Sequence, residues 1–301
     1  MRLMNRLGLV ASALSFAVLL SPRCSAEDLP QRRSVMIFGQ RIEYYDVGTG
    51  PVVVLLHGLG TSAQVDWGKC IMPLSAHHRV LAPDQLGFGA SDKPVIEYSI
   101  QTWVDMLGEF LRVEGAKDFT LAGESLGGWI AAQYAIQALG NQASVGPSLR
   151  LPCPGRLILV DAAGHKHLAV GSAEGGPGLS LAGSMGLLSA IYMDPSYSTD
   201  DAVRAQFARS MSKGDGWTIH SVFSNRTLLN ECIDGKLGQI TIPTLVVWGA
   251  GDKVLPLDDG KDYAANIPGA KLVIIPGSGH APGIEKPNLL VAAVEAFLGD
   301  R

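Results

Sequence analysis

The chain has 301 residues, with 24 basic and 28 acidic side chains. Because these charges nearly balance and no segment is rich in lysine or arginine, the sequence lacks the electrostatic footprint typical of nucleic-acid binding or of an anionic membrane surface. A neutral small molecule is therefore the expected partner. Glycine is frequent, at 36 residues, and the glycines gather at a few turns, which are the first places to look for chemistry.

The N-terminal residues have the pattern of a secretory signal peptide. Arg2 and Arg6 precede an apolar run over residues 7–20, and the small side chains that end at Ala26 suit a signal peptidase. The run has about 14 residues, whereas a membrane-spanning helix needs about 20. We therefore expect residues 1–26 to be a signal peptide and the mature protein to be secreted or periplasmic; an uncleaved anchor is the alternative.

Cysteine spacing indicates neither a metal site nor a redox site. Once the signal peptide is removed, Cys70, Cys153 and Cys232 remain, an odd set that permits at most one internal disulfide. No set of His, Asp and Glu residues has a convincing metal-ligand spacing either. The sequence therefore predicts no metal and no organic cofactor.

From residue 34 onward, strand-like segments alternate with helical ones. Residues 34–48 are typical of a strand pair, and buried strands are expected at 51–58, 78–84, 118–124, 156–164, 244–252 and 270–280. Their near-continuous Val, Ile and Leu content indicates burial on both faces of a mostly parallel sheet. Helical patterns are expected at 99–114, 126–139, 257–267 and 286–298. The alternation predicts a doubly wound α/β sheet.

The alternation is interrupted once, by a segment that predicts helices and no buried strand. We expect residues 165–240 to form a helical cap inserted between a first part of the core, 27–164, and a second part, 241–301. Within the cap, residues 199–213 have a helical pattern, with Thr199 or Asp200 as its N-cap.

The first chemical signal is Ser125, which lies between Gly123 and Gly127 directly after a predicted strand and before a predicted helix. A side chain raised on a sharp strand-to-helix turn needs small neighbours, and these two glycines supply them. The serine is then displayed for nucleophilic attack. The alternative is that Ser125 is an ordinary helix N-cap, which is a common role for serine.

Two further signals follow later strands. Asp252 comes after the strand that ends near Trp248, and His280 comes after the last strand. The order Ser, acid, His is the one expected when a serine on such a turn acts as a nucleophile. Because active sites of parallel sheets gather at the carboxyl ends of strands, we predict that Ser125, Asp252 and His280 form a catalytic triad. Asp161, at the end of the neighbouring strand, is the alternative acid.

A fourth signal, His57-Gly58-Leu59-Gly60, follows the apolar residues VVVLL of the predicted strand. Acyl transfer needs hydrogen-bond donors directed at the developing oxyanion, and backbone N–H groups supply them without a charged side chain. We expect the N–H groups of Leu59 and Leu126 to form this oxyanion hole. His57 is expected to brace the loop rather than to act as a base.

Together these motifs resemble the α/β-hydrolase superfamily, over essentially all of the chain from about residue 34 to 299. The motifs that carry the resemblance are HGLG at 57, DQLGFGASDKP at 84, GESLGG at 123, GAGDKVLP at 249 and GSGHAP at 277. The resemblance implies that the predicted cap is the lid of this superfamily.

Within the superfamily, DQLGFGASDKP and the cap are similar to the branch of haloalkane dehalogenases, epoxide hydrolases, carbon–carbon bond hydrolases and small esterases. The first two use an aspartate nucleophile, so Ser125 argues against an alkyl-enzyme mechanism. Tyr192 and Tyr197 of the cap are accordingly expected to be packing residues rather than epoxide-opening groups.

The sequence thus predicts a serine hydrolase that cleaves a small to medium carboxylic ester through an acyl-enzyme. The alternatives with the same residues are carbon–carbon bond cleavage, which the predicted export disfavours, acyl transfer, perhydrolysis and a slow-turnover receptor. Apolar cap residues 186–193 are open to three roles: lining an acyl pocket, meeting a lipid surface, or simply covering the core.

Overall fold

The computed structural model describes residues 29–140, 142, 145–166, 179–225 and 228–299. The predicted signal peptide and residues 167–178 at the front of the cap lie outside this part of the chain. Within the described ranges, no helix combines the length and apolarity needed to cross a bilayer.

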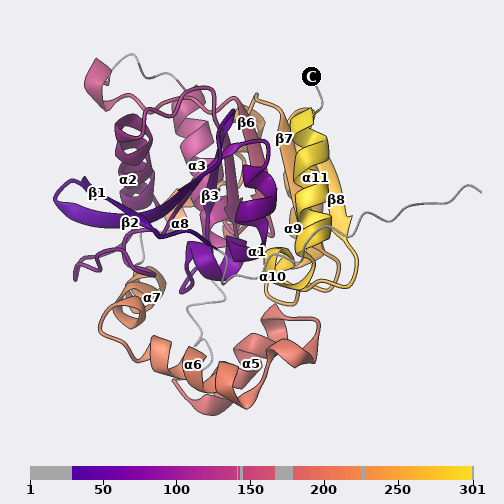
Figure 1. The fold of residues 1–301 in the computed structure, drawn as a ribbon. Coiled ribbons are helices and arrows are strands. Elements are labelled where there is room, and N and C mark those ends of the chain that lie inside the picture. The colour runs from indigo at the N-terminus through magenta and orange to yellow at the C-terminus, as the bar shows by residue number, and fades with distance from the viewer. Residues whose placement is uncertain (1–28, 141, 143–144, 167–178, 226–227, 300–301) are drawn as a thin grey trace, which may run out of the picture.

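The strands form one mostly parallel sheet, as the sequence predicted (Figure 1). Its order is β1-β2-β4-β3-β5-β6-β7-β8. The pairs β1–β2 and β2–β4 are antiparallel, and the five pairs from β4–β3 to β7–β8 are parallel. The strands are β1 Arg33–Ile37, β2 Gln40–Val47, β3 Val52–Leu56, β4 Arg79–Pro83, β5 Thr120–Glu124, β6 Arg156–Val160, β7 Thr244–Gly249 and β8 Lys271–Ile275.

The register brings the carboxyl ends of the central strands to one edge of the sheet. Leu56 of β3 pairs with Gly123 of β5, and Glu124 pairs with Val160 of β6. Val160 in turn pairs with Val247 of β7. The loops that follow β3, β5, β6 and β7 therefore begin side by side.

Helices cover both faces of the sheet. Helices α1 and α11 pack on one face, where Trp67 and Leu290 join the strand side chains. Helices α2, α3 and α9 pack on the other, around Trp103 and Tyr263. The core helices are α1 Ala63–Ser75, α2 Ile100–Val113, α3 Leu126–Leu139, α9 Leu257–Asn266, α10 Pro282–Glu285 and α11 Pro287–Gly299.

Two elements differ from the sequence prediction. Helix α1 was not predicted, because Gly68 and Pro73 within it interrupt the helical pattern. The run at 270–280 was predicted to be a buried strand, but β8 lies at the edge of the sheet and Ile274 is 43% exposed. An edge strand is paired on one side only, so an apolar run there does not require burial on both faces.

The described residues between β6 and β7 contain helices, most of which lie below the sheet in Figure 1, while residues 228–231 pack against α2. Thr199 is the N-cap of α6, and its hydroxyl accepts a hydrogen bond from Ala202 N–H at 3.2 Å. The helices are α5 Leu181–Ile191, α6 Asp200–Ser210, α7 Asp215–Ser224 and α8 Leu228–Glu231. We refer to the described residues 179–240 as the cap.

The three described cysteines, Cys70, Cys153 and Cys232, are free thiols, so the one disulfide that the sequence permits does not form among them. Burial raises the pKa of the Cys70 thiol, which lies inside α1.

Helix α1 should contribute to stability through its buried face. Leu74 is 1% exposed, so we expect Leu74→Ala to lower the free energy of unfolding by about 2–5 kcal/mol. Val65 on the same helix is 41% exposed, and Val65→Ala should change this free energy by less than about 0.5 kcal/mol. Urea denaturation of both variants measures the difference, and equal losses would contradict this packing.

Candidate active site

Ser125 lies on a strained turn between β5 and α3, with φ 55° and ψ −117°. Three backbone hydrogen bonds hold this conformation: Ser125 N–H donates to Val160 O, and Ser125 O accepts from Trp129 N–H and Ala163 N–H. A Cβ atom at Gly123 would overlap the carbonyl of Gly127, so the turn can close only around a glycine. Such strain in a non-glycine residue typically marks a functional site.

The same geometry decides between the two interpretations of this serine. Ser125 does occupy the N-cap position of α3, but its side chain makes no capping hydrogen bond. Its Oγ instead lies 2.9 Å from Nε2 of His280. The hydroxyl is therefore displayed toward a base.

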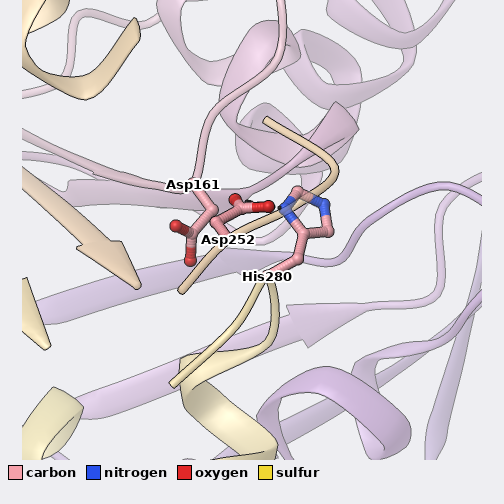
Figure 2. Close-up of side chains that lie close together, drawn as sticks. All are labelled: Asp161, Asp252 and His280. Carbon is pink, nitrogen blue, oxygen red and sulfur yellow. Dashed lines mark hydrogen bonds and ion pairs between the residues drawn. The ribbon is translucent and has the colours of Figure 1, made fainter. Parts of the chain in front are cut away.

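His280 connects Ser125 to a carboxylate. Nδ1 of His280 lies 2.8 Å from Oδ2 of Asp252, and Figure 2 shows the ring directed at this carboxylate. The other oxygen of Asp252 accepts hydrogen bonds from Val254 N–H at 2.8 Å and Leu255 N–H at 2.9 Å. The acid is thus fixed by backbone donors, and the imidazole is held between acid and serine.

Asp161, the alternative acid, is close to the triad but does not bond His280 (Figure 2). It is fully buried, and Oδ1 accepts a hydrogen bond from Gly249 N–H at 2.8 Å. Oδ2 has no hydrogen-bond partner among the described residues. Burial, with the nearby carboxylate of Asp252, raises the pKa of Asp161 well above its usual range, which favours the neutral form of this acid.

The oxygen and nitrogen atoms of Asp161, Asp252 and His280 lie within 4.8 Å of one another, a spacing that could hold a metal ion. In this geometry Asp252 and His280 are already bonded to each other and to Ser125. The donor set therefore fits the hydrogen-bonded chain better than it fits an ion, which would displace that chain.

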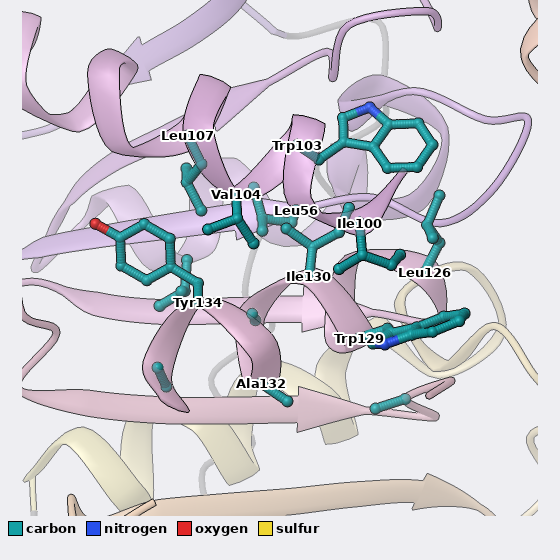
Figure 3. Close-up of a cluster of buried hydrophobic side chains, with 14 of the residues drawn as sticks. Leu56, Ile100, Trp103, Val104, Leu107, Leu126, Trp129, Ile130, Ala132 and Tyr134 are labelled. Carbon is teal, nitrogen blue, oxygen red and sulfur yellow. The ribbon is translucent and has the colours of Figure 1, made fainter. Parts of the chain in front are cut away.

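Helix α3 supports the turn from below. Figure 3 shows Leu126, Trp129 and Ile130 of α3 packed among apolar side chains of β3 and α2. All three are buried. This packing fixes the start of α3, and with it the N–H groups that follow Ser125.

A buried helix residue shapes the loop after β3. Oδ2 of Asp66, in the first turn of α1, accepts hydrogen bonds from Gly58 N–H at 2.8 Å and from the Thr61 hydroxyl at 2.5 Å. Gly58 itself contacts Ser125, since a Cβ atom at Gly58 would lie 3.2 Å from the serine Cβ. Asp66 therefore sets the distance between this loop and the nucleophile.

His57 braces the same loop, as expected. Its Nε2 accepts a hydrogen bond from Gln85 N–H at 2.9 Å, so the ring proton is on Nδ1, which donates to Gly58 O at 2.8 Å. The Gln85 side chain donates in return to His57 O at 2.7 Å. With both ring nitrogens hydrogen-bonded to backbone groups, His57 has no nitrogen left to act as a base on Ser125.

The N–H groups of Leu59 and Leu126, the expected oxyanion donors, lie in the loop beside Ser125 and at the first residue of α3. Within the described part of the chain, neither N–H has a hydrogen-bond acceptor. The positive end of the helix dipole of α3 adds to the potential for a negative charge at this point. From the cap, Arg209 donates to Gly60 O at 3.0 Å and so contacts the same loop.

Tyr192 and Tyr197 pack together in the cap, with ring centroids 5.2 Å apart. The Tyr197 hydroxyl donates to Ile284 O at 3.3 Å. Burial, with the charges of Asp66 and Glu124, raises the pKa of Tyr192 to about 12.

Sequence reasoning predicted Ser125, Asp252 and His280, which the structure brings within hydrogen-bond distance of one another, but it missed three side chains that bond the surrounding loops or lie buried beside them: Asp66, Glu124 and Glu285. Asp66 lies nine residues after His57 and Glu285 five residues after His280, yet only the folded chain shows what they bond. Glu124 is 3% exposed, and one of its oxygens has no hydrogen-bond partner in the described chain. Burial, with the charges of nearby aspartates, raises its pKa well above the usual range.

The model of the alpha/beta hydrolase family matches residues 53–294. The chain belongs to this family. The match spans the elbow, both parts of the core and the cap, and it agrees with the resemblance drawn from the five motifs. The protein is therefore a hydrolase of the α/β fold.

Similar proteins fall into more than one substrate class. The 2-hydroxy-6-oxo-6-(2'-aminophenyl)hexa-2,4-dienoic acid hydrolase of Metapseudomonas resinovorans is 28% identical, over 89% of this chain and 91% of its own. A variant of the meta-cleavage product hydrolase of Pseudomonas fluorescens has a similar structure, with TM-score 0.74 and 27% identity over 89% of this chain and 97% of its own. An esterase from Rhodococcus matches with TM-score 0.71 and 26% identity, over 90% of this chain and 99% of its own.

The two acids should differ sharply when each is made neutral. Asp252→Asn should lower kcat by about ten thousandfold because the amide no longer stabilises the charged imidazole, whereas Asp161→Asn should lower it by less than about tenfold because Asp161 bonds Gly249 N–H and not His280. Steady-state hydrolysis of an activated ester measures both. The reverse order would make Asp161 the working acid.

The raised pKa of Glu124 predicts how stability depends on pH. The folded state keeps the Glu124 proton at pH values where the unfolded chain, with a pKa of about 4.3, has lost it. The free energy of unfolding therefore decreases as the pH rises between the unfolded and the folded pKa, by at most about 1.4 kcal/mol per pH unit. Glu124→Gln should remove this contribution and make stability decline less as the pH rises above about 4.3.

Urea denaturation at several pH values measures the slope, with the exposed Glu97→Gln as the matched control. A constant difference between Glu124→Gln and wild type at every pH would contradict a protonated Glu124.

Proposed function

We propose that the protein is a serine hydrolase that cleaves a carboxylic ester of small or medium size. Ser125 is the nucleophile, His280 the general base and acid, and Asp252 the group that orients the imidazole. The observation that carries the proposal is the unbroken chain of hydrogen bonds from Ser125 Oγ through His280 to Asp252, at 2.9 and 2.8 Å.

In the acylation step, Ser125 Oγ attacks the ester carbonyl carbon while its proton passes to Nε2 of His280. The carbonyl oxygen becomes an oxyanion, and the N–H groups of Leu59 and Leu126 donate to it. The carbon–oxygen bond to the alcohol then breaks, and His280 returns the proton to the departing alkoxide. The acyl group remains on Ser125.

In the deacylation step, His280 removes a proton from water, and the resulting hydroxide attacks the acyl carbon. The same two N–H groups stabilise the second oxyanion. The bond to Ser125 Oγ breaks, the proton on His280 returns to the serine, and the carboxylic acid leaves. Asp252 stays ionised throughout and stabilises the imidazolium in both steps.

The charges around the site favour a neutral acyl group. Asp66 and Glu124 are buried and Asp252 is half-buried, and these carboxyl groups near Ser125 disfavour an anionic group on the substrate. From the cap, the apolar side chain of Ile219 lies against Gly60 of the oxyanion loop. A neutral, partly apolar ester fits these surroundings.

Carbon–carbon bond cleavage is the second candidate, because the meta-cleavage hydrolase of Pseudomonas fluorescens and the dienoic acid hydrolase are similar to this chain over most of its length. It would use the same three residues. Arg209, which lies beside the oxyanion loop, is the cation that could pair with the carboxylate of such a substrate.

A substrate panel separates the two candidates. We expect turnover of p-nitrophenyl esters, graded by acyl length, to exceed turnover of a dienoic diketone, and Ser125→Ala to lower ester hydrolysis by up to about a millionfold. Ser189→Ala, at an exposed position in α5, is the control and should retain full activity.

Each other outcome has a definite meaning. Faster cleavage of the diketone would support carbon–carbon hydrolysis, and a single burst without turnover would favour a receptor. Full ester hydrolysis by Ser125→Ala would refute the mechanism.

A further inference from the structure

Glu285 is a buried carboxylate that joins the His280 loop to the cap. It ends α10, and its side chain is not used by the proposed reaction. Oε2 accepts hydrogen bonds from Gly279 N–H at 2.6 Å and from the Ser278 hydroxyl at 3.4 Å. Oε1 accepts a hydrogen bond from Asp194 N–H, in the cap, at 2.8 Å. The Glu285 side chain therefore bonds both Gly279, the residue before His280, and Asp194 of the cap.

A second hydrogen bond joins the same two segments. The N–H of His280 donates to Ile191 O, at the end of α5, at 2.7 Å. Gly279 is packed so closely against this carbonyl that a Cβ atom would overlap it. Residues 191–194 of the cap thus contact His280 directly and again through Glu285.

The buried N–H of Gly279 needs this partner. The loop from Pro276 to Ala281 has no regular secondary structure, and a buried N–H without an acceptor is costly. Without Oε2 of Glu285, the loop would shift to find another acceptor. Nε2 of His280 would then move from its 2.9 Å contact with Ser125, and a displacement of about 1 Å at a reacting group can cost about a hundredfold in rate.

We propose that Glu285 is a positioning residue that makes the placement of His280 depend on the docking of the cap. The inference rests on the proposed function in one respect, namely that His280 is the base for Ser125. Glu285 accepts from the His280 loop with one oxygen and from the cap with the other, so the loop and the cap are held in a fixed relation.

The test uses Glu285→Gln, whose amide is the same size but can accept only with its oxygen, so its NH₂ faces one of the two N–H donors. We expect the rate of covalent labelling of Ser125 by a fluorophosphonate to fall by about ten- to a hundredfold. This reagent needs the serine and its base but not the natural substrate. The exposed Glu97→Gln is the matched control and should be labelled at the wild-type rate.

A spectroscopic measurement separates positioning from a general loss of structure. The low-field proton resonance of His280 Nδ1–H, bonded to Asp252, should shift or broaden in Glu285→Gln while circular dichroism is unchanged. If Glu285→Gln does not fold, Glu285→Asp, which keeps the charge but is one methylene shorter, takes its place and should show the same slower labelling.

A pair of variants at position 194 tests the link to the cap without touching Glu285. Asp194→Ala and Asp194→Pro both lose the side-chain bond to Ser196 N–H, but only proline also removes the backbone N–H that bonds Glu285. The backbone φ of −85° at this position tolerates proline. We expect labelling to be several-fold slower in Asp194→Pro than in Asp194→Ala.

Wild-type labelling rates for Glu285→Gln and Glu285→Asp would overturn the positioning role. Equal rates for the two Asp194 variants would overturn the link to the cap. If wild type is labelled but cleaves neither ester nor diketone, the proposed substrate fails while the Glu285 comparison still stands. If wild type is not labelled at all, both proposals fail.

Discussion

The strained backbone of Ser125 is the constraint on which the rest of the site depends. Its φ of 55° persists because β6, the loop after β6 and the first turn of α3 supply hydrogen bonds to both of its backbone polar groups, and because Gly123 leaves room for the turn. This single conformation raises the hydroxyl toward His280 and starts α3 at Leu126. The nucleophile, one oxyanion donor and the positive helix end therefore share one structural origin.

Burial of carboxyl groups then distinguishes the acids at neighbouring strand ends. Asp161 and Asp252 follow adjacent parallel strands, so their carboxyls approach each other, and two like charges at this separation cannot both persist without water. Asp252 accepts hydrogen bonds from two backbone N–H groups and contacts His280. Asp161 accepts from one N–H, and its raised pKa favours its neutral form. The acid is thus chosen by the number of donors at each strand end.

The cap forms hydrogen bonds with the loop at Gly60 and with the loop that contains His280. Arg209 bonds the oxyanion loop at Gly60, and Ile191 bonds the backbone of His280. Glu285 ties Asp194 to the residue before His280. These bonds join the cap to the two loops that hold the proposed oxyanion donors and His280. A change in the cap that alters substrate fit would therefore also alter the geometry of the base.

The sequence by itself determined the sheet, the elbow and the order of Ser125, Asp252 and His280, because apolar runs and glycine turns are local patterns that mark strand ends. It left helix α1 unpredicted and could not separate the two roles of Ser125 or rank the two acids by geometry. Those decisions, and the parts played by Asp66, Glu124 and Glu285, came from the tertiary structure. Their partners are backbone groups far along the chain or charges brought together by burial, and neither leaves a periodic signal in the sequence.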